Sequence, residues 1–230
     1  MLTDLPLYQQ MILTLAAMVL FTAFVLLAQT RITSIIDTYA WQGALVALTT
    51  ALVAFDSDQP HLYLSAVLTF SLKALFIPWL LHSMVIRLNI GREPHRVDHP
   101  FAVLLLASGI VLFCYYIVLP IQQLAAHSIT RNVIAVSMSV VLLGLLMLIT
   151  RKKAVTQVVG FMSLENGLFF SAVAATHGMP MVVELGIAFD VLIAAVISSI
   201  FFFHIRDSID SLDVGQMHKL SEGDVEGDKT

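Results

Sequence analysis

The sequence predicts an all-α, polytopic membrane protein with seven transmembrane helices. Of the 230 residues, 58% are hydrophobic and 12% are charged, whereas a soluble domain has about 45–50% apolar and about 25% charged residues. The apolar runs exceed about 18 residues, the length that a helix needs to cross a bilayer. None alternates polar and apolar residues as the strands of a membrane β-barrel do. The chain is therefore expected to form a bundle of membrane helices.

Short polar breaks separate the apolar runs and predict where each helix ends. Charged residues, histidine or proline occupy every break: Arg31, Asp56 to Pro60, Arg87 to Pro100, His127 to Arg131, Arg151 to Lys153 and His177 to Pro180. Charged groups are costly in hydrocarbon and are tolerated at its surface. A kink or helix end is expected near Pro78 and Pro120. The expected spans are residues 7–28, 32–54, 62–86, 101–124, 132–150, 154–176 and 181–204.

Basic residues are distributed unequally between the two faces of this bundle. Of the twelve Lys and Arg residues, ten fall on one face, Arg131 alone falls on the other, and Lys73 lies within a span. Short cytoplasmic loops are enriched in Lys and Arg. The C-terminus is therefore expected in the cytoplasm and the N-terminus outside. Residues 207–230 are rich in acidic residues and glycine and are expected to form a cytoplasmic tail.

Two carboxylic acids lie near the middle of the predicted membrane. At a rise of about 1.5 Å per residue, Glu165 and Asp190 lie about 15 Å deep in a hydrocarbon core about 30 Å thick. An ionisable group at this depth costs at least about 2.5 kcal/mol and often belongs to a proton pathway. We therefore expect both acids to relay protons. Hydrogen bonding between helices, with Asn166 contributing beside Glu165, is the alternative.

Lys73 is a third charge within the membrane. It lies about 11 residues from the start of its span and about 13 from the end, too far to reach either surface comfortably. It needs a carboxylate or a water-filled pocket, and a lysine beside an acid can load and release a proton. A static ion pair that fixes helix packing is the alternative.

Glu184 and Asp37 complete the set of relay candidates. Glu184 lies about 9 Å nearer the outer face than Asp190, and a solvated helix start accounts for it as well. Asp37 lies about 8 Å inside the cytoplasmic end of its span, as a proton-uptake residue or an ordinary interfacial acid. Among the histidines only His82 is a further relay candidate, and its place near a span end also fits an interfacial role.

The sequence predicts a non-catalytic chain without a cofactor of its own. Its one cysteine, Cys114, cannot hold an iron–sulfur cluster, and the histidines do not face each other at membrane depth as a haem requires. No Walker motif, dinucleotide fingerprint, metal-binding Cys/His spacing or nucleophile elbow is present. We expect no bound metal and no nucleic-acid partner, and any redox chemistry is expected in partner subunits.

Four stretches carry a family pattern: Ser71-Leu-Lys-Ala-Leu-Phe-Ile-Pro78, Gly160-Phe-Met-Ser-Leu-Glu-Asn166, Val183-Glu-Leu-Gly-Ile-Ala-Phe-Asp190 and Ser211-Leu-Asp-Val-Gly215. They resemble component E of membrane-bound nickel–iron hydrogenases of the hydrogenase-4 and formate hydrogenlyase type. The last three spans also resemble the three-helix K subunit of respiratory complex I and the C subunit of multisubunit cation/proton antiporters. In the K subunit two helices each carry a mid-membrane glutamate. Glu165 matches the first, and the shorter Asp190 falls at the second, which leaves open whether Asp190 relays alone or with Glu184.

The resemblance implies a subunit of an energy-converting complex in the inner membrane of a bacterium or archaeon. Residues 1–130 would be a four-helix membrane region, residues 131–206 a region like the K subunit, and residues 207–230 the tail. Expected partners are antiporter-like membrane subunits, other membrane-arm subunits and a cytoplasmic hydrogenase-like arm that holds the nickel–iron centre and iron–sulfur clusters. The buried acids and the lysine would carry protons within the membrane arm.

Two other functions fit the same residues. A subunit of a multisubunit sodium/proton antiporter would use the same acids without a redox arm. A structural spacer between larger pumps would keep Glu165 and Asp190 dry against polar partners, and their substitution would then impair assembly rather than coupling.

Overall fold

Helices account for every regular element that the structure describes. The computed structural model describes residues 7–57, 60–87, 100–119, 128–175, 185–197 and 199. The described residues up to Val191 form one compact unit, and those from Leu192 on belong to another. The predicted all-α class is confirmed. The elements are α1 (Leu7–Ala28), α2 (Ile32–Ser57), α3 (Pro60–Thr69), η1 (Phe70–Phe76), α4 (Ile77–Arg87), α5 (Pro100–Val118), α6 (Ser128–Thr150), α7 (Ala154–Ala175) and a shorter apolar helix, Leu185–Ile197.

Within the described residues, five helices are long and apolar enough to cross a membrane: Leu7–Ala28, Ile32–Phe55, Tyr63–Ile86, Pro100–Val118 and Asn132–Thr150. They overlap the first five predicted spans and are typical of a multi-pass membrane protein. Helices also occupy the sixth and seventh predicted spans, as α7 and Leu185–Ile197. The number of seven transmembrane segments stays a prediction.

Several sequence predictions fall outside the described residues. They concern Glu184, Pro120, the breaks at residues 88–99 and 176–180, and the tail at residues 207–230.

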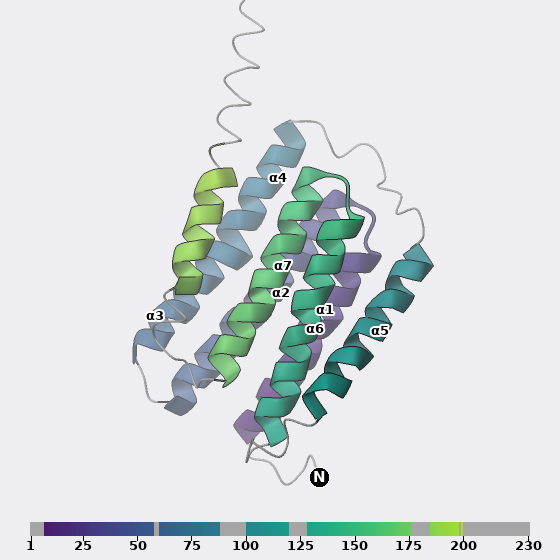
Figure 1. Ribbon diagram of the computed structural model, residues 1–230. Coiled ribbons are helices and arrows are strands. Elements are labelled where there is room, and N and C mark those ends of the chain that lie inside the picture. The colour runs from purple at the N-terminus through teal and green to yellow at the C-terminus, as the bar shows by residue number, and fades with distance from the viewer. Residues whose placement is uncertain are drawn as a thin grey trace, which may run out of the picture. The chain divides into compact units, whose positions relative to one another are not determined.

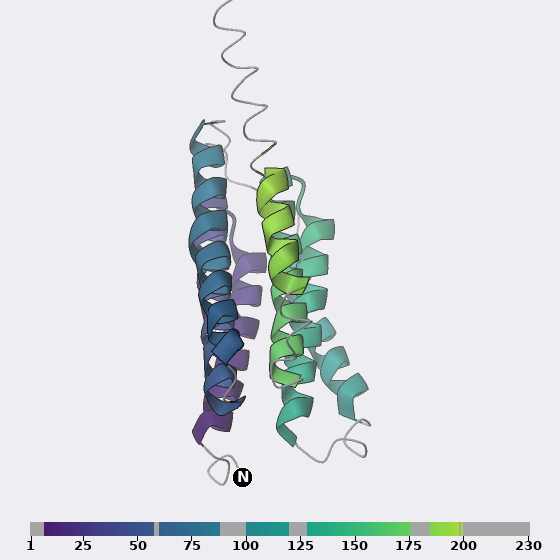
Figure 2. The ribbon, with the colours of Figure 1, turned by 90° about the vertical axis from the view of Figure 1, so that its left-hand side faces the viewer.

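Helix α2 has neighbours on several sides within the first unit. It packs against α1, against the segment formed by α3, η1 and α4, and against α7. Helix α6 packs against α5, α7 and α1. Figures 1 and 2 show α1 to α4 and α5 to α7 as two rows of helices. Because α2 contacts both η1 and α7, side chains from these elements meet in the interior.

The third predicted span has a wide turn in its middle. In η1 the helix is π-helical, and the N–H of Ile77 donates to the carbonyl of Leu72, five residues earlier. Pro78 follows directly; it has no N–H, and its ring would clash with the carbonyl four residues before it in an α-helix. A π turn accommodates such a proline by inserting an extra residue. The sequence predicts a kink or helix end near Pro78, and the structure places a π-helical segment containing Lys73 just before it.

The backbones of α6 and α7 approach each other closely at Gly144. A Cβ at Gly144 would lie 2.6 Å from the backbone nitrogen of Leu164 and 2.8 Å from its Cα. Small residues at such positions let membrane helices pack backbone to backbone. This contact holds the turn of α7 that carries Glu165.

Candidate functional site

Three charged side chains meet inside the first unit: Lys73 of η1, Glu165 of α7 and Asp190 of the Leu185–Ile197 helix. We call them the charged cluster. Lys73 Nζ donates a hydrogen bond to Glu165 Oε2 and forms an ion pair with it. The same Nζ lies 3.4 Å from Asp190 Oδ1, and the side chains of Lys73 and Asp190 are 0% exposed. The structure thus brings together the three residues that the sequence places deepest in the membrane.

Close packing fixes Lys73 between α2 and the two acids. A Cβ at Gly43 of α2 would lie 2.9 Å from Lys73 Cβ and 3.1 Å from the Lys73 carbonyl oxygen. Gly43 therefore allows α2 to approach the π turn more closely than another residue would. On the opposite helix, Lys73 Nζ lies 4.9 Å from the ring centroid of Phe169, within the range of a cation–π contact.

Uncharged polar side chains are buried in α2, α3 and α7 as well. Tyr39 and Gln42 come from α2, Thr69 from α3 and Asn166 from α7, and all four are buried. Asn166 Nδ2 donates to Gln42 Oε1 at 3.3 Å. Among the described residues, no hydrogen-bond partner is found for Tyr39 Oη, Gln42 Nε2, Thr69 Oγ1 or Asn166 Oδ1. Buried polar groups are generally hydrogen-bonded to protein or to ordered water, so ordered water is the expected partner of these atoms.

Sequence reasoning singled out Asn166 but missed Tyr39, Gln42 and Thr69. Tyr39 and Gln42 are three residues apart, which places them on one face of a helix. Thr69 precedes Lys73 by four residues and so lies on the same side of its segment. These spacings were the available signal, and they gain meaning only once Lys73 is known to face inward.

Asp37 lies apart from the charged cluster, at the surface of the unit. Its side chain is 67% exposed, and Asp37 Oδ1 lies 3.9 Å from His82 Nδ1 of α4. It lines an open hollow of about 500 Å³ together with Trp41 and residues of η1. Its role in a relay stays a prediction, and so does that of Glu184, which lies outside the described residues.

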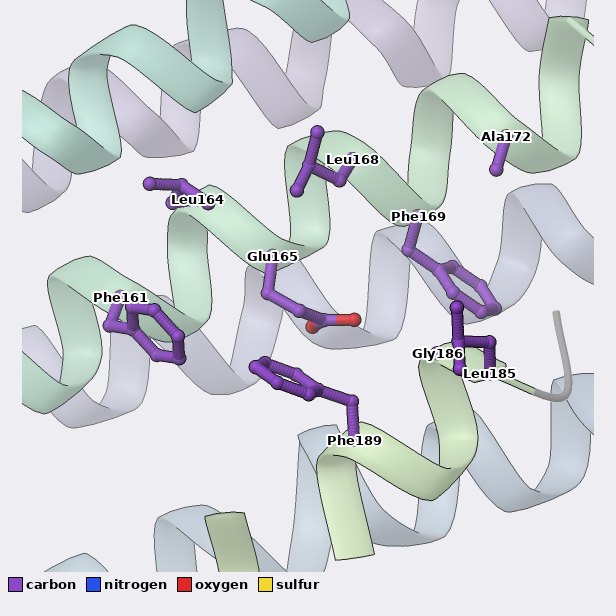
Figure 3. Close-up of a pocket in the computed structure, with 9 residues that line it drawn as sticks. All are labelled: Phe161, Leu164, Glu165, Leu168, Phe169, Ala172, Leu185, Gly186 and Phe189. Atoms are coloured by element: carbon purple, nitrogen blue, oxygen red, sulfur yellow. The ribbon is translucent and has the colours of Figure 1, made fainter. Parts of the chain in front are cut away.

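Glu165 also lines an apolar pocket between α7 and the Leu185–Ile197 helix (Figure 3). The pocket has a volume of about 470 Å³, and the other residues of its lining are apolar. The ring of Phe189 lies beside the Glu165 side chain (Figure 3), and its centroid is 5.8 Å from that of the Phe161 ring. Glu165 therefore connects the buried cluster with a pocket.

Arg151 has a structural role that the sequence did not reveal. It follows α6 in a break where it was counted as a cytoplasmic loop charge, yet it is only 2% exposed. Its Nη2 donates to the carbonyls of Leu26, Leu27 and Gln29 at 3.3, 2.8 and 2.7 Å. A helix leaves its last carbonyls without intrahelical donors, and the guanidinium supplies them at the end of α1.

No group of three or more His, Cys, Asp or Glu side chains that could hold a metal ion occurs in the described ranges. Cys114 is buried, and its thiol is free. The absence of a cofactor from this chain stays a prediction.

Bacterial proteins resemble this chain over most of its length. It is 30% identical over 190 residues to Uncharacterized protein Rv0085 of Mycobacterium tuberculosis, covering 82% of this chain and 86% of that protein. It is 25% identical over 182 residues to Hydrogenase-4 component E of Escherichia coli strain K12, covering 79% of this chain and 84% of that protein. The protein of the same name from Shigella flexneri matches to the same extent. No family model matches the chain, and no solved structure matches it significantly.

Proposed function

This chain belongs to the family of the Mycobacterium tuberculosis protein Rv0085 and is distantly homologous to Hydrogenase-4 component E, and from this we propose that it is a non-catalytic membrane subunit of an energy-converting, hydrogenase-type complex. Its task is to carry protons through the charged cluster. The observation that carries this proposal is the position of Lys73, buried between two acids from different helices.

The charged cluster is built to hold a proton and release it. Lys73 supplies one positive charge for two carboxyl groups, so the cluster is neutral with one acid protonated and carries an excess negative charge with both ionised. Because Lys73 Nζ contacts Glu165 and lies 3.4 Å from Asp190, the lysine can change partners as a proton moves between the acids. The charge states of such closely spaced groups depend on one another. A redox event that moves a charge in a neighbouring subunit would therefore shift the proton.

The proposed assembly also rests on the homology to Hydrogenase-4 component E. The partners are antiporter-like and other membrane-arm subunits, together with a cytoplasmic arm that carries the nickel–iron centre and iron–sulfur clusters. This chain crosses the inner membrane seven times, with the N-terminus outside, and its last three spans correspond to the complex I K subunit. Residues 1–130, 131–206 and 207–230 form its two membrane regions and its tail.

Glu165→Gln tests the proposal in the assembled complex, because glutamine keeps the size of the side chain but cannot exchange a proton. We expect the subunit to remain in the purified complex, while electron-transfer-driven proton transport into reconstituted vesicles falls to background. Glu226→Gln makes the same chemical change in the acidic tail, outside the predicted relay, and should leave proton transport largely intact.

Normal proton transport by the Glu165→Gln complex would refute the relay. A structural spacer makes the opposite prediction, since the variant would then reduce the amount of assembled complex and leave coupling intact in what remains. Measuring assembly and transport on the same preparation separates these two outcomes.

A further inference from the structure

The pocket beside Glu165 opens at the surface of the first unit. Its rim is apolar: Leu168 is 54% exposed and Leu185 is 71% exposed. In a membrane, such side chains face either lipid or another helix. The carboxyl group of Glu165 projects between α7 and the Leu185–Ile197 helix (Figure 3). Its chemistry indicates whether lipid or another helix fills the pocket.

Glu165 directs its two oxygens to different places. Oε2 accepts the hydrogen bond from Lys73. Oε1 lies 3.8 Å from the point that a Cβ of Gly186 would occupy, and such a Cβ would also lie 2.6 Å from the ring of Phe169. A larger residue at position 186 would therefore crowd the space between the carboxyl group and the pocket wall. With glycine there, the carboxyl group can be approached from the pocket.

The charge of the cluster indicates which chemical group binds in the pocket. Lys73 can balance only one of the two acids, so a second positive charge is needed whenever both are ionised. A lipid tail brings neither a charge nor a hydrogen-bond donor, and a charged group facing hydrocarbon is costly. We infer that the pocket receives a lysine or arginine side chain from a membrane helix of a neighbouring subunit. This inference rests on the proposed function, because it requires the chain to work within a complex.

The pocket walls suit the apolar stem of such a side chain. Lysine and arginine bury their methylene groups against apolar surface while the charged end reaches a polar partner. The rings of Phe161 and Phe189 line the pocket together with Glu165, and aromatic rings attract cations. The exposed Leu168 and Leu185 would pack against the rest of the neighbouring helix. The partner's charge would then favour the state in which both acids are ionised, which links proton release from the cluster to the neighbouring subunit.

Photocrosslinking in the assembled complex tests this contact directly. A photoreactive amino acid is placed at Leu168 or at Leu185, and mass spectrometry identifies the crosslinked peptide. Leu112 of α5, which is 72% exposed and does not line the pocket, is the matched control. We expect both pocket positions to crosslink one membrane subunit, within about two helical turns of a lysine or arginine in its span. Replacing that basic residue by methionine should reduce the yield at both positions at least about fivefold.

Crosslinks only to lipid, to a copurified small amine, or to a helix without a basic residue near the crosslink would overturn the inference. Equal crosslinking of the same peptide from Leu112 would also overturn it. None of these results depends on proton transport, so failure here leaves the Glu165→Gln transport measurement as a separate test of the proposed function.

Discussion

Lys73 has two acidic neighbours, and its charge can balance only one of them at a time. Its side chain is fully buried, as is that of Asp190, and it contacts Glu165 directly. Removing one member of a buried ion pair is more damaging than removing both, because the remaining charge is left without compensation. The cluster is therefore expected to show strong energetic coupling between its members.

Lys73→Met should destabilise the protein by about 3–5 kcal/mol, since two buried carboxyl groups then lack a cation. The double variant Lys73→Met with Glu165→Gln should recover part of this loss, because it removes one of the uncompensated acids. Thermal unfolding of the purified protein in detergent, followed by circular dichroism, measures both changes. Arg31→Met, at an exposed position, is the control and should shift stability by no more than about 0.5 kcal/mol. A double variant less stable than Lys73→Met would contradict the expected coupling.

The sequence predicts a depth in the membrane for Glu165, Asp190 and Lys73, because each residue of a helix adds a fixed rise. Their meeting could be anticipated only in part, since the need of Lys73 for a partner did not identify that partner. The direction of each side chain around its helix was not predictable. A membrane helix is apolar both toward lipid and toward its neighbours, so the pattern that reveals the buried face of a soluble helix is weak. Tyr39 and Gln42 were missed for this reason.

Among the helices, the contact between α6 and α7 is the one that most directly positions the site. Gly144 sits against the backbone of Leu164, the residue before Glu165. A backbone cannot move aside as a flexible side chain can, so any side chain at position 144 must separate the helices. The five long apolar helices could be predicted from the lengths of the apolar runs in the sequence. The close contact between α6 and α7 could not, because it depends on which glycines face inward.

Gly144→Ala should destabilise the protein by about 1–3 kcal/mol through overpacking. Gly109→Ala provides a matched control in α5, because nothing lies within 4 Å of a Cβ there. This control should be neutral or stabilising by up to about 1 kcal/mol, because alanine is the better helix former. Thermal unfolding of both variants in detergent gives the comparison. Equal stability of the two would show that the close contact does not limit packing.

The π turn of η1 is a second feature that helix-scale reasoning did not predict. Pro78 indicates a disturbed helix, but a kink, a break and a π turn can each accommodate a proline, which lacks the backbone N–H. In this protein the neighbouring packing includes Gly43, which lies against Lys73. Which of these three conformations forms therefore depends on contacts with α2, whose residues are distant in the sequence.

For the whole molecule, the unequal distribution of basic residues predicts an odd number of membrane crossings. Ten Lys and Arg residues fall on one predicted face and Arg131 alone on the other. An even number of spans would place basic segments on both faces, against the preference of Lys and Arg for the cytoplasm. Five of the described helices are long and apolar enough to cross a membrane, and they do not fix the side on which either terminus lies.

Cysteine labelling of intact cells tests this topology. Cys114 is the chain's only cysteine, so Cys114→Ser provides a background without thiols. A membrane-impermeant maleimide should label Thr3→Cys and Asp58→Cys from outside the cell, but label Asn89→Cys and Ser221→Cys only in inverted vesicles. Labelling of Thr3→Cys and Ser221→Cys from the same side would require an even number of spans. One of the helices α7 and Leu185–Ile197 would then fail to cross the membrane, and the depth assigned to Glu165 or Asp190 would be wrong.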